Sequence, residues 1–186
     1  MPTDRTQTRK ASEVYAEVLL QAAQGPDAIL ALSEQLGQAL GTIVGSIELR
    51  AALSDASLPA EARQQIAAEV FAGFDAALLA WLGVLIERGD LGLLPRINEA
   101  YLYAAEEALG AVIIDVTTVV PLDDQLRQQL KQKYAAQLGG EVILREHIDD
   151  SIVGGIVMST HGRRIDASIV SQLQNARATL TQQQAG

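Results

Sequence analysis

The chain has 186 residues, which is enough for one medium-sized domain or two small ones that each bury a core. Its 23 Asp and Glu residues outnumber its 14 Lys and Arg residues, and the net charge of −9 would repel a phosphate backbone, so we expect no nucleic-acid partner. The absence of Cys excludes disulfides, thiolate metal sites and cysteine nucleophiles. Hydrophobic residues make up 48% of the chain but aromatic residues only 4%, which favours closely packed helices rich in Ala, Leu, Val and Ile.

No segment is expected to enter a membrane. The first ten residues carry charge and lack the apolar core of a signal peptide. The longest apolar run, residues 76–86, is well short of the roughly 20 residues that a membrane helix needs. We therefore expect a soluble protein that would work at a membrane only if another protein held it there.

Before about Gly110 the apolar residues recur at three- and four-residue steps, which predicts helices. The first helix should end near Gly25 and Pro26, and its expected inward stripe is Ala11, Val14, Tyr15, Val18, Leu19 and Ala22. A second helix has Ile29, Leu32, Leu36 and Leu40 along one stripe and should run to about Gly41, and a shorter helix follows through Ile47 and Leu53. Pro59 should start a fourth helix with Ile66, Val70 and Phe71 inward, and residues 94–108 a sixth with Ile97, Tyr101, Leu102 and Ala105 inward.

The fifth helix, residues 76–88, is apolar almost all the way round, and Asp75 is placed to cap it. Such a helix is either central in a bundle or offers part of its surface to a partner. It contains Trp81, the only tryptophan of the chain.

After Gly110 the pattern changes to β-branched runs. Residues 111–120 are predicted to form a strand, and a helix follows through Leu126, Leu130, Tyr134 and Leu138. Two further strands are expected at residues 142–148 and 153–159, and a short fourth strand should end at Ile165. A last helix, capped by Asp166 or Ser168, then leads to a polar tail from Thr181. The predicted fold class is mainly α, with an N-terminal bundle of about six helices at residues 1–108 and a small α+β C-terminal domain at residues 109–186.

No catalytic, cofactor or metal site is expected. His147 and His161 are the only imidazoles and lack an evident set of convergent ligands or a nucleophile in the sequence. Asp149 and Asp150 suit a turn rather than an acid and base pair, because adjacent residues do not face each other. The pair Gly154 and Gly155 lacks the spacing of a nucleotide-binding loop.

Several short motifs nevertheless follow one another in a distinctive order. They are Tyr15-Ala16, Leu53-Ser54 with Leu58-Pro59, Glu87-Arg88-Gly89-Asp90-Leu91, Gly139-Gly140, Asp149-Asp150-Ser151, Gly154-Gly155 and Arg164-Ile165-Asp166-Ala167-Ser168. Over residues 15–180 this order resembles the delta subunit of F-type ATP synthases, whose mitochondrial relative is the oligomycin-sensitivity-conferring protein. The chain departs from the family pattern at Ser159, Ala167 and Gly162.

The resemblance implies a non-catalytic connector in the stator of the enzyme. Its helical domain would bind N-terminal segments of the alpha subunits on the catalytic head, and its C-terminal domain would hold the b subunits of the peripheral stalk. The resemblance further implies a single copy per complex, at the cytoplasmic face of a bacterial cell membrane. Two linked interfaces of ordinary size would reinforce each other against the rotor torque.

The family receives the alpha segment between its first and fifth helices, which implies a helix-in-groove interface here. The candidate partner-facing residues are Ala16 and Leu20 on the first helix and Leu79 and Leu82 on the fifth, with core packing as the alternative. Two rival classes remain: a free-standing helical adaptor or regulator, and an enzyme, which would require a pocket of convergent polar groups. Flanking genes for other ATP synthase subunits would favour the connector.

Overall fold

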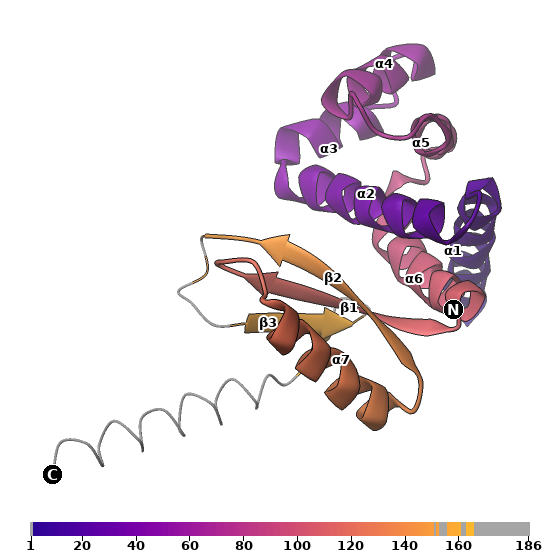
Figure 1. The fold of residues 1–186 in the computed structure, drawn as a ribbon. Coiled ribbons are helices and arrows are strands. Elements are labelled where there is room, and N and C mark those ends of the chain that lie inside the picture. Colours follow the sequence, from indigo (N-terminus) through magenta and orange to yellow (C-terminus); the bar gives the residue numbers. More distant parts are fainter. Residues whose placement is uncertain (1, 151, 153–155, 161–162, 166–186) are drawn as a thin grey trace, which may run out of the picture. The chain divides into compact units, whose positions relative to one another are not determined.

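The computed structural model describes residues 2–150, 152, 156–160 and 163–165 of the chain (Figure 1). It divides into two compact units, Met1–Leu109 and Gly110–Gly186, one residue beyond the boundary expected from the sequence. The first unit contains α1 (Pro2–Ala22), α2 (Pro26–Gly45), α3 (Ile47–Ser54), α4 (Ala60–Val70), α5 (Ala76–Arg88), the short 3-10 helix η1 (Leu91–Leu93) and α6 (Leu94–Leu109). The predicted fold class, a helical bundle followed by a small α+β part, is confirmed.

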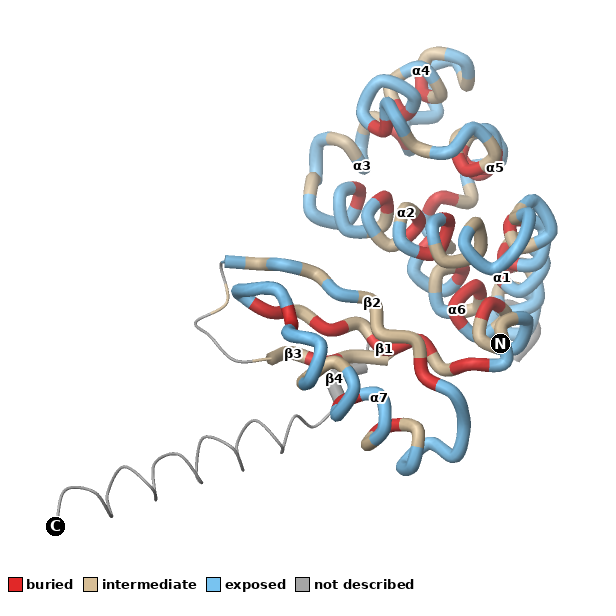
Figure 2. The backbone as a smooth tube through the Cα atoms, in the orientation of Figure 1, coloured by how far each residue is buried: buried red, intermediate tan, exposed pale blue. Residues whose placement is uncertain are grey.

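The helices of the first unit bury their facing sides. In this unit α1 and α2 pack on α6, α1 also contacts α5, and α4 packs on α5. The facing sides carry the buried residues, whereas the outer sides are exposed (Figure 2). Large side chains that are almost fully buried include Leu19, Leu36, Leu78, Leu85, Ile97 and Tyr101. The hydroxyl of Tyr101 donates to the carbonyl of Ile29 at 3.1 Å, which joins α6 to α2.

Capping residues explain where several helices begin and end. The side chain of Ser46 accepts from the backbone N–H of Leu49 at the start of α3, and that of Asp75 accepts from Ala77 at the start of α5. Gly89 ends α5 with φ 72°, a left-handed conformation that favours glycine. One predicted boundary was wrong, because α2 continues past Gly41 to Gly45.

The predicted inward stripe of α1 was only partly right. Leu19 is buried as predicted, but Val14 and Val18 are 59% and 53% exposed, and Ser12 and Ala16 are buried in their place. Small side chains at Ser12 and Ala16 allow α1 to approach its neighbours closely. Burial of Ser12 is inexpensive because its hydroxyl donates to the carbonyl of Thr8 at 2.9 Å. In α4, likewise, Phe71 at the end is buried as predicted but Val70 is exposed.

Arg63 of α4 is a buried charged residue that the sequence did not reveal. Its Nη1 donates to the carbonyl of Ile86 at 2.7 Å and to that of Leu53 at 3.4 Å. These carbonyls belong to the last turns of α5 and α3, where helices lack internal donors and a cation is favoured. Arg63 therefore ties the ends of two helices to α4, although its buried Nε has no partner.

The second unit contains β1 (Ala111–Thr118), α7 (Asp124–Leu138), β2 (Glu141–Ile148), β3 (Ile156–Thr160) and β4 (Arg163–Ile165). The described strands form a four-stranded sheet in the order β2-β1-β3-β4. β1 pairs in parallel with β2, and the crossover between them is α7; β1 pairs antiparallel with β3, and β3 with β4. The first strand ends at Thr118, two residues before its predicted end, and the hydroxyl of Thr118 donates to the carbonyl of Val120.

Helix α7 covers one face of this sheet. The core between them consists of Ile114, Val116, Leu122, Leu130, Tyr134, Val142 and Met158. Asp123 caps α7 by accepting from the backbone N–H of Leu126 at 2.6 Å, and Gly139 closes it with φ 71°. Arg127 of α7 donates to both carboxylate oxygens of Glu146 on β2, at 2.5 and 3.2 Å. These contacts fasten the helix to the edge strand of the sheet.

Some sequence predictions lie outside the described residues. They are the Gly154 and Gly155 pair, His161 with Gly162, Ser151, and the last helix with its capping candidates Asp166 and Ser168. The strand predicted from residue 153 is described from Ile156 onward.

Arg63→Met should lower the free energy of unfolding of the helical unit by about 2 kcal/mol, because the carbonyls of Leu53 and Ile86 lose a charged donor. Urea unfolding followed by fluorescence of Trp81, the only tryptophan, reports on this unit alone. The control Arg50→Met removes an exposed arginine and should change stability by less than about 0.5 kcal/mol. Unchanged stability of Arg63→Met would mean that the desolvation penalty of the guanidinium cancels the gain from its hydrogen bonds.

The ion pair between Arg127 and Glu146 makes the second unit sensitive to acid. Hydrogen bonding to Arg127, the largest effect, holds the pKa of Glu146 below its ordinary value of 4.5. The stabilisation is therefore present at neutral pH and is lost as the pH falls through this lowered pKa. Glu146→Gln should reduce protection of the β1 and β2 amides by about 1 kcal/mol at pH 7, measured by hydrogen exchange corrected for intrinsic rates. A difference from the wild type that persists after the carboxyl group is protonated would contradict this assignment.

Candidate protein-binding site

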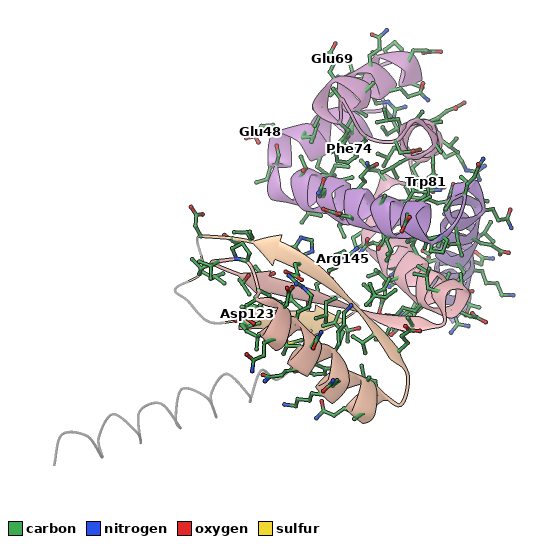
Figure 3. The ribbon with its side chains drawn as sticks, viewed as in Figure 1. Glu48, Glu69, Phe74, Trp81, Asp123 and Arg145 are labelled. Atoms are coloured by element: carbon green, nitrogen blue, oxygen red, sulfur yellow. The ribbon has the colours of Figure 1, made fainter. Side chains whose placement is uncertain are left out.

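A hydrogen-bonded aromatic pair joins α1 to α5. The indole N–H of Trp81 on α5 donates to the backbone carbonyl of Tyr15 on α1 at 3.0 Å. The two rings meet edge to face, with centroids 6.4 Å apart and planes at 90°. Trp81 is only 6% exposed and lies between the two helices (Figure 3). This contact fixes the position of α1 beside α5.

The turn after α5 completes this junction. Because Gly89 ends the helix in a left-handed conformation, Asp90 is placed where its Oδ2 accepts from the Tyr15 hydroxyl at 2.6 Å. Arg88 lies 3.5 Å from the same oxygen. Burial, and next the hydrogen bond to Asp90, raise the pKa of Tyr15, so the phenol stays protonated and donates at neutral pH. The Tyr-Ala and Arg-Gly-Asp motifs, 75 residues apart, thus meet in one structure.

Three exposed valines border this junction, and we call them the valine surface: Val14, Val18 and Val84. They are 59%, 53% and 45% exposed. Val18 follows Tyr15 by three residues and Val84 follows Trp81 by three, so each projects from the same side of its helix as the aromatic residue. Val14 precedes Val18 by one turn. The paired helices therefore present solvent-exposed apolar side chains next to a rigid aromatic contact.

The four residues predicted to face a partner do not gather on one surface. Ala16 and Leu82 are each only 1% exposed and belong to the core. Leu20 is partly exposed but lies on the side of α1 that faces α6, beside Tyr103 and Ala104. Leu79 is partly exposed one turn before Gly83, whose position borders the side chain of Gln64 on α4. The valine surface was missed because Val14 and Val18 had been assigned to the core and Val84 had not been singled out on the fifth helix.

A polar cluster lies on the sheet of the second unit. Asp115 of β1 accepts from Arg145 of β2 at 2.5 Å, and Nε2 of His147 lies 3.2 Å from the same carboxylate oxygen. His147 thus has charged neighbours that its sequence context did not reveal. The carboxylate is already bonded by a guanidinium, and the cluster is an ion-paired link between two strands. Within the described ranges, no group of three His, Asp or Glu side chains is arranged to hold a metal ion.

No helix in the described part of the chain is both long enough and apolar enough to cross a membrane. The most apolar one, α5, has 13 residues, and five of them are buried within the helical unit.

The hydrogen bond between Tyr15 and Asp90 should stabilise the junction measurably. Tyr15→Phe and Asp90→Asn remove its donor and its charged acceptor, and the double variant removes both. A double-mutant cycle by urea unfolding, followed through Trp81, should give a coupling energy of about 1 kcal/mol. Strictly additive effects of the two single variants would show that the hydrogen bond adds nothing to stability.

Comparison with known proteins assigns the chain to a family. The family model described as "ATP synthase delta (OSCP) subunit" matches residues 11–180. A protein named "ATP synthase subunit delta" from Prochlorococcus marinus is 31% identical over 169 residues, which cover 90% of this chain and 94% of the relative. A protein of the same name from Rhodopirellula baltica is 28% identical over 166 residues, which cover 88% of this chain and 73% of the relative.

A chain of similar fold occurs in a solved ATP synthase structure. A chain in the cryo-EM structure of the Toxoplasma gondii mitochondrial ATP synthase hexamer aligns with a TM-score of 0.52 at 16% identity, covering 91% of this chain and 97% of that one. At that identity the likeness concerns the fold alone, and the sequence match carries the assignment. Matched along most of its length, the chain belongs to the ATP synthase delta (OSCP) subunit family.

Proposed function

We propose that this protein is a non-catalytic connector in the stator of an F-type ATP synthase, linking the catalytic head to the peripheral stalk so that rotation is coupled to ATP synthesis. The observation that carries the proposal is the family match over residues 11–180, which spans both compact units. A connector needs two binding regions on one chain, and two units with separate cores are suited to that task. Linked binding then holds the head more firmly than either contact alone.

The helical unit binds the N-terminal segments of alpha subunits through the valine surface in this proposal. An amphipathic helix laid along α1 and α5 would cover Val14, Val18 and Val84 with its apolar face. The Tyr15 and Trp81 contact keeps the two helices in place before binding, which lowers the entropic cost of forming the interface. Exposed valines that serve no core in the isolated chain acquire a function as an interface.

The second unit binds the b subunits of the peripheral stalk in the same proposal. The family relationship alone supports this step, and we assign no residue of the unit to the contact. One copy of the connector would serve each catalytic head. The protein would be a peripheral component at the cytoplasmic face of a bacterial cell membrane, held there through the complex.

Paired valine substitutions test the interface. Val18→Asp combined with Val84→Asp should weaken binding of a synthetic peptide of the cognate alpha subunit's N-terminal segment by more than about tenfold, since carboxylates would be buried without partners. Isothermal titration calorimetry with the full chain measures the affinity. Both valines are exposed in the free protein, so thermal stability should change little.

The sequence-based candidates provide the contrast. Leu20→Asp combined with Leu79→Asp changes two partly exposed residues on other sides of the same helices. If this pair abolishes peptide binding by a folded protein while the valine pair does not, the valine surface is wrong and the interface includes Leu20 or Leu79. If neither pair affects binding, the segment docks elsewhere.

A further inference from the structure

A second groove runs along α1 on the side that faces α6. Two adjoining hollows of about 540 and 620 Å³ form it, and both are bordered by Glu13, Ala100 and Tyr103. Residues 5–13 of α1 line the first hollow with residues 96–103 of α6, and residues 13–20 line the second with residues 100–108. The helices therefore lie side by side in the same direction. At the helical rise, residues 5–20 extend for about 24 Å, the length of a helix of some four turns.

One end of this groove is rich in arginine. Arg5, Arg9 and Arg96 line it, and they are three of the seven Lys and Arg residues among residues 1–109. Glu13 and Glu99 lie at the same end. The Arg9 to Glu13 ion pair, at 3.3 Å, has side chains 74% and 55% exposed, so it holds Arg9 only weakly. No ion pair to Arg5 or Arg96 occurs among the described side chains.

The other end is acidic. Glu13, Glu17 and Glu107 line the second hollow, and no Lys or Arg lines it. The groove is thus polarised along its length, from arginine to glutamate. A ligand of uniform charge, such as a nucleic-acid strand or an anionic membrane, would be attracted at one end and repelled at the other.

The floor of the groove is small and apolar. Ala100, Ala104 and Ala108 repeat every four residues along α6 and therefore share one side of that helix. Leu20 adds an apolar side chain from α1, and Tyr103, 51% exposed, borders both hollows. Small side chains let the backbone of a third helix approach closely.

We propose that the α1/α6 groove docks an amphipathic helix of another protein subunit, with an acidic end over Arg5, Arg9 and Arg96 and a basic end over Glu17 and Glu107. Its small or apolar side lies on the alanines of α6. The charge pattern of the groove selects this occupant over a helix with mixed charges. The site is separate from the valine surface and does not depend on the role proposed for it.

A designed peptide tests the proposal on the full-length protein. The probe is a helical peptide of about 18 residues with an Ala and Leu stripe, Glu in its first two turns and Lys in its last two. A second peptide of identical composition alternates Glu and Lys along its polar side. Fluorescence anisotropy at low salt should show at least about tenfold tighter binding of the polarised peptide, and the preference should decrease as salt is raised.

Matched variants locate the binding site. Ala104→Trp fills the floor of the groove and should abolish binding, whereas Ala80→Trp, at an exposed position on α5, should leave it unchanged. Arg5→Glu combined with Arg96→Glu should weaken binding of the polarised peptide about tenfold while circular dichroism stays unchanged. The proposal would be overturned if the polarised peptide did not bind, or if the two peptides bound with equal affinity. It would also be overturned if folded Ala80→Trp alone lost binding, or if the protein bound anionic vesicles in preference to the peptide.

Discussion

The contact of Tyr15 with Trp81 and Asp90 is the interaction on which the arrangement of the helical unit depends. It joins the first helix to the middle of the fifth and to the turn that follows it, through two hydrogen bonds and an edge-to-face aromatic contact. The hydrogen bond to Asp90 depends on Gly89, which must adopt a left-handed conformation to position the carboxylate. The contact with the indole requires that Trp81 lie on the side of α5 that faces α1. Because this contact fixes α1 against α5, the exposed residues on the α5 side and on the α6 side of α1 lie at defined positions.

The two surfaces of α1 differ in chemistry, and the difference follows from its sequence. Val14 and Val18 lie on the α5 side and offer exposed aliphatic area. Glu13, Glu17 and Leu20 lie on the α6 side, in a groove with charged ends. Between them, Ser12, Ala16 and Leu19 face the core. One helix therefore contributes to the packing of the unit and to two separate candidate interfaces. Its neighbours supply the opposite wall of each.

The sequence predicted the elements better than it predicted their faces. Periodicity and caps located α5, α3 and α7 closely. Asp75 favours the start of a helix, and Gly89 and the Gly139 to Gly140 pair favour the end of one. The inward face of α1 was misassigned because hydrophobicity favours valine for a core, whereas close helix packing here selects Ser12 and Ala16. Arg63 was missed for a related reason, since its burial depends on carbonyls of α3 and α5 that are distant in sequence. The pairing of Asp115 with Arg145 and His147 likewise required the register of β1 and β2.

The proposed connecting function requires one chain that carries two units, each with its own core, so the most direct test asks whether the covalent link matters. Membranes carrying the rest of the enzyme but lacking this subunit can be supplied with the full chain, or with a mixture of residues 1–109 and residues 110–186. Proton pumping driven by ATP hydrolysis measures the coupling between head and membrane part. We expect the full chain to restore pumping and the unlinked pair to fail, even when each fragment is present at a concentration that saturates its proposed binding site. Equal restoration by the unlinked pair, or no effect of the full chain, would contradict a connecting role.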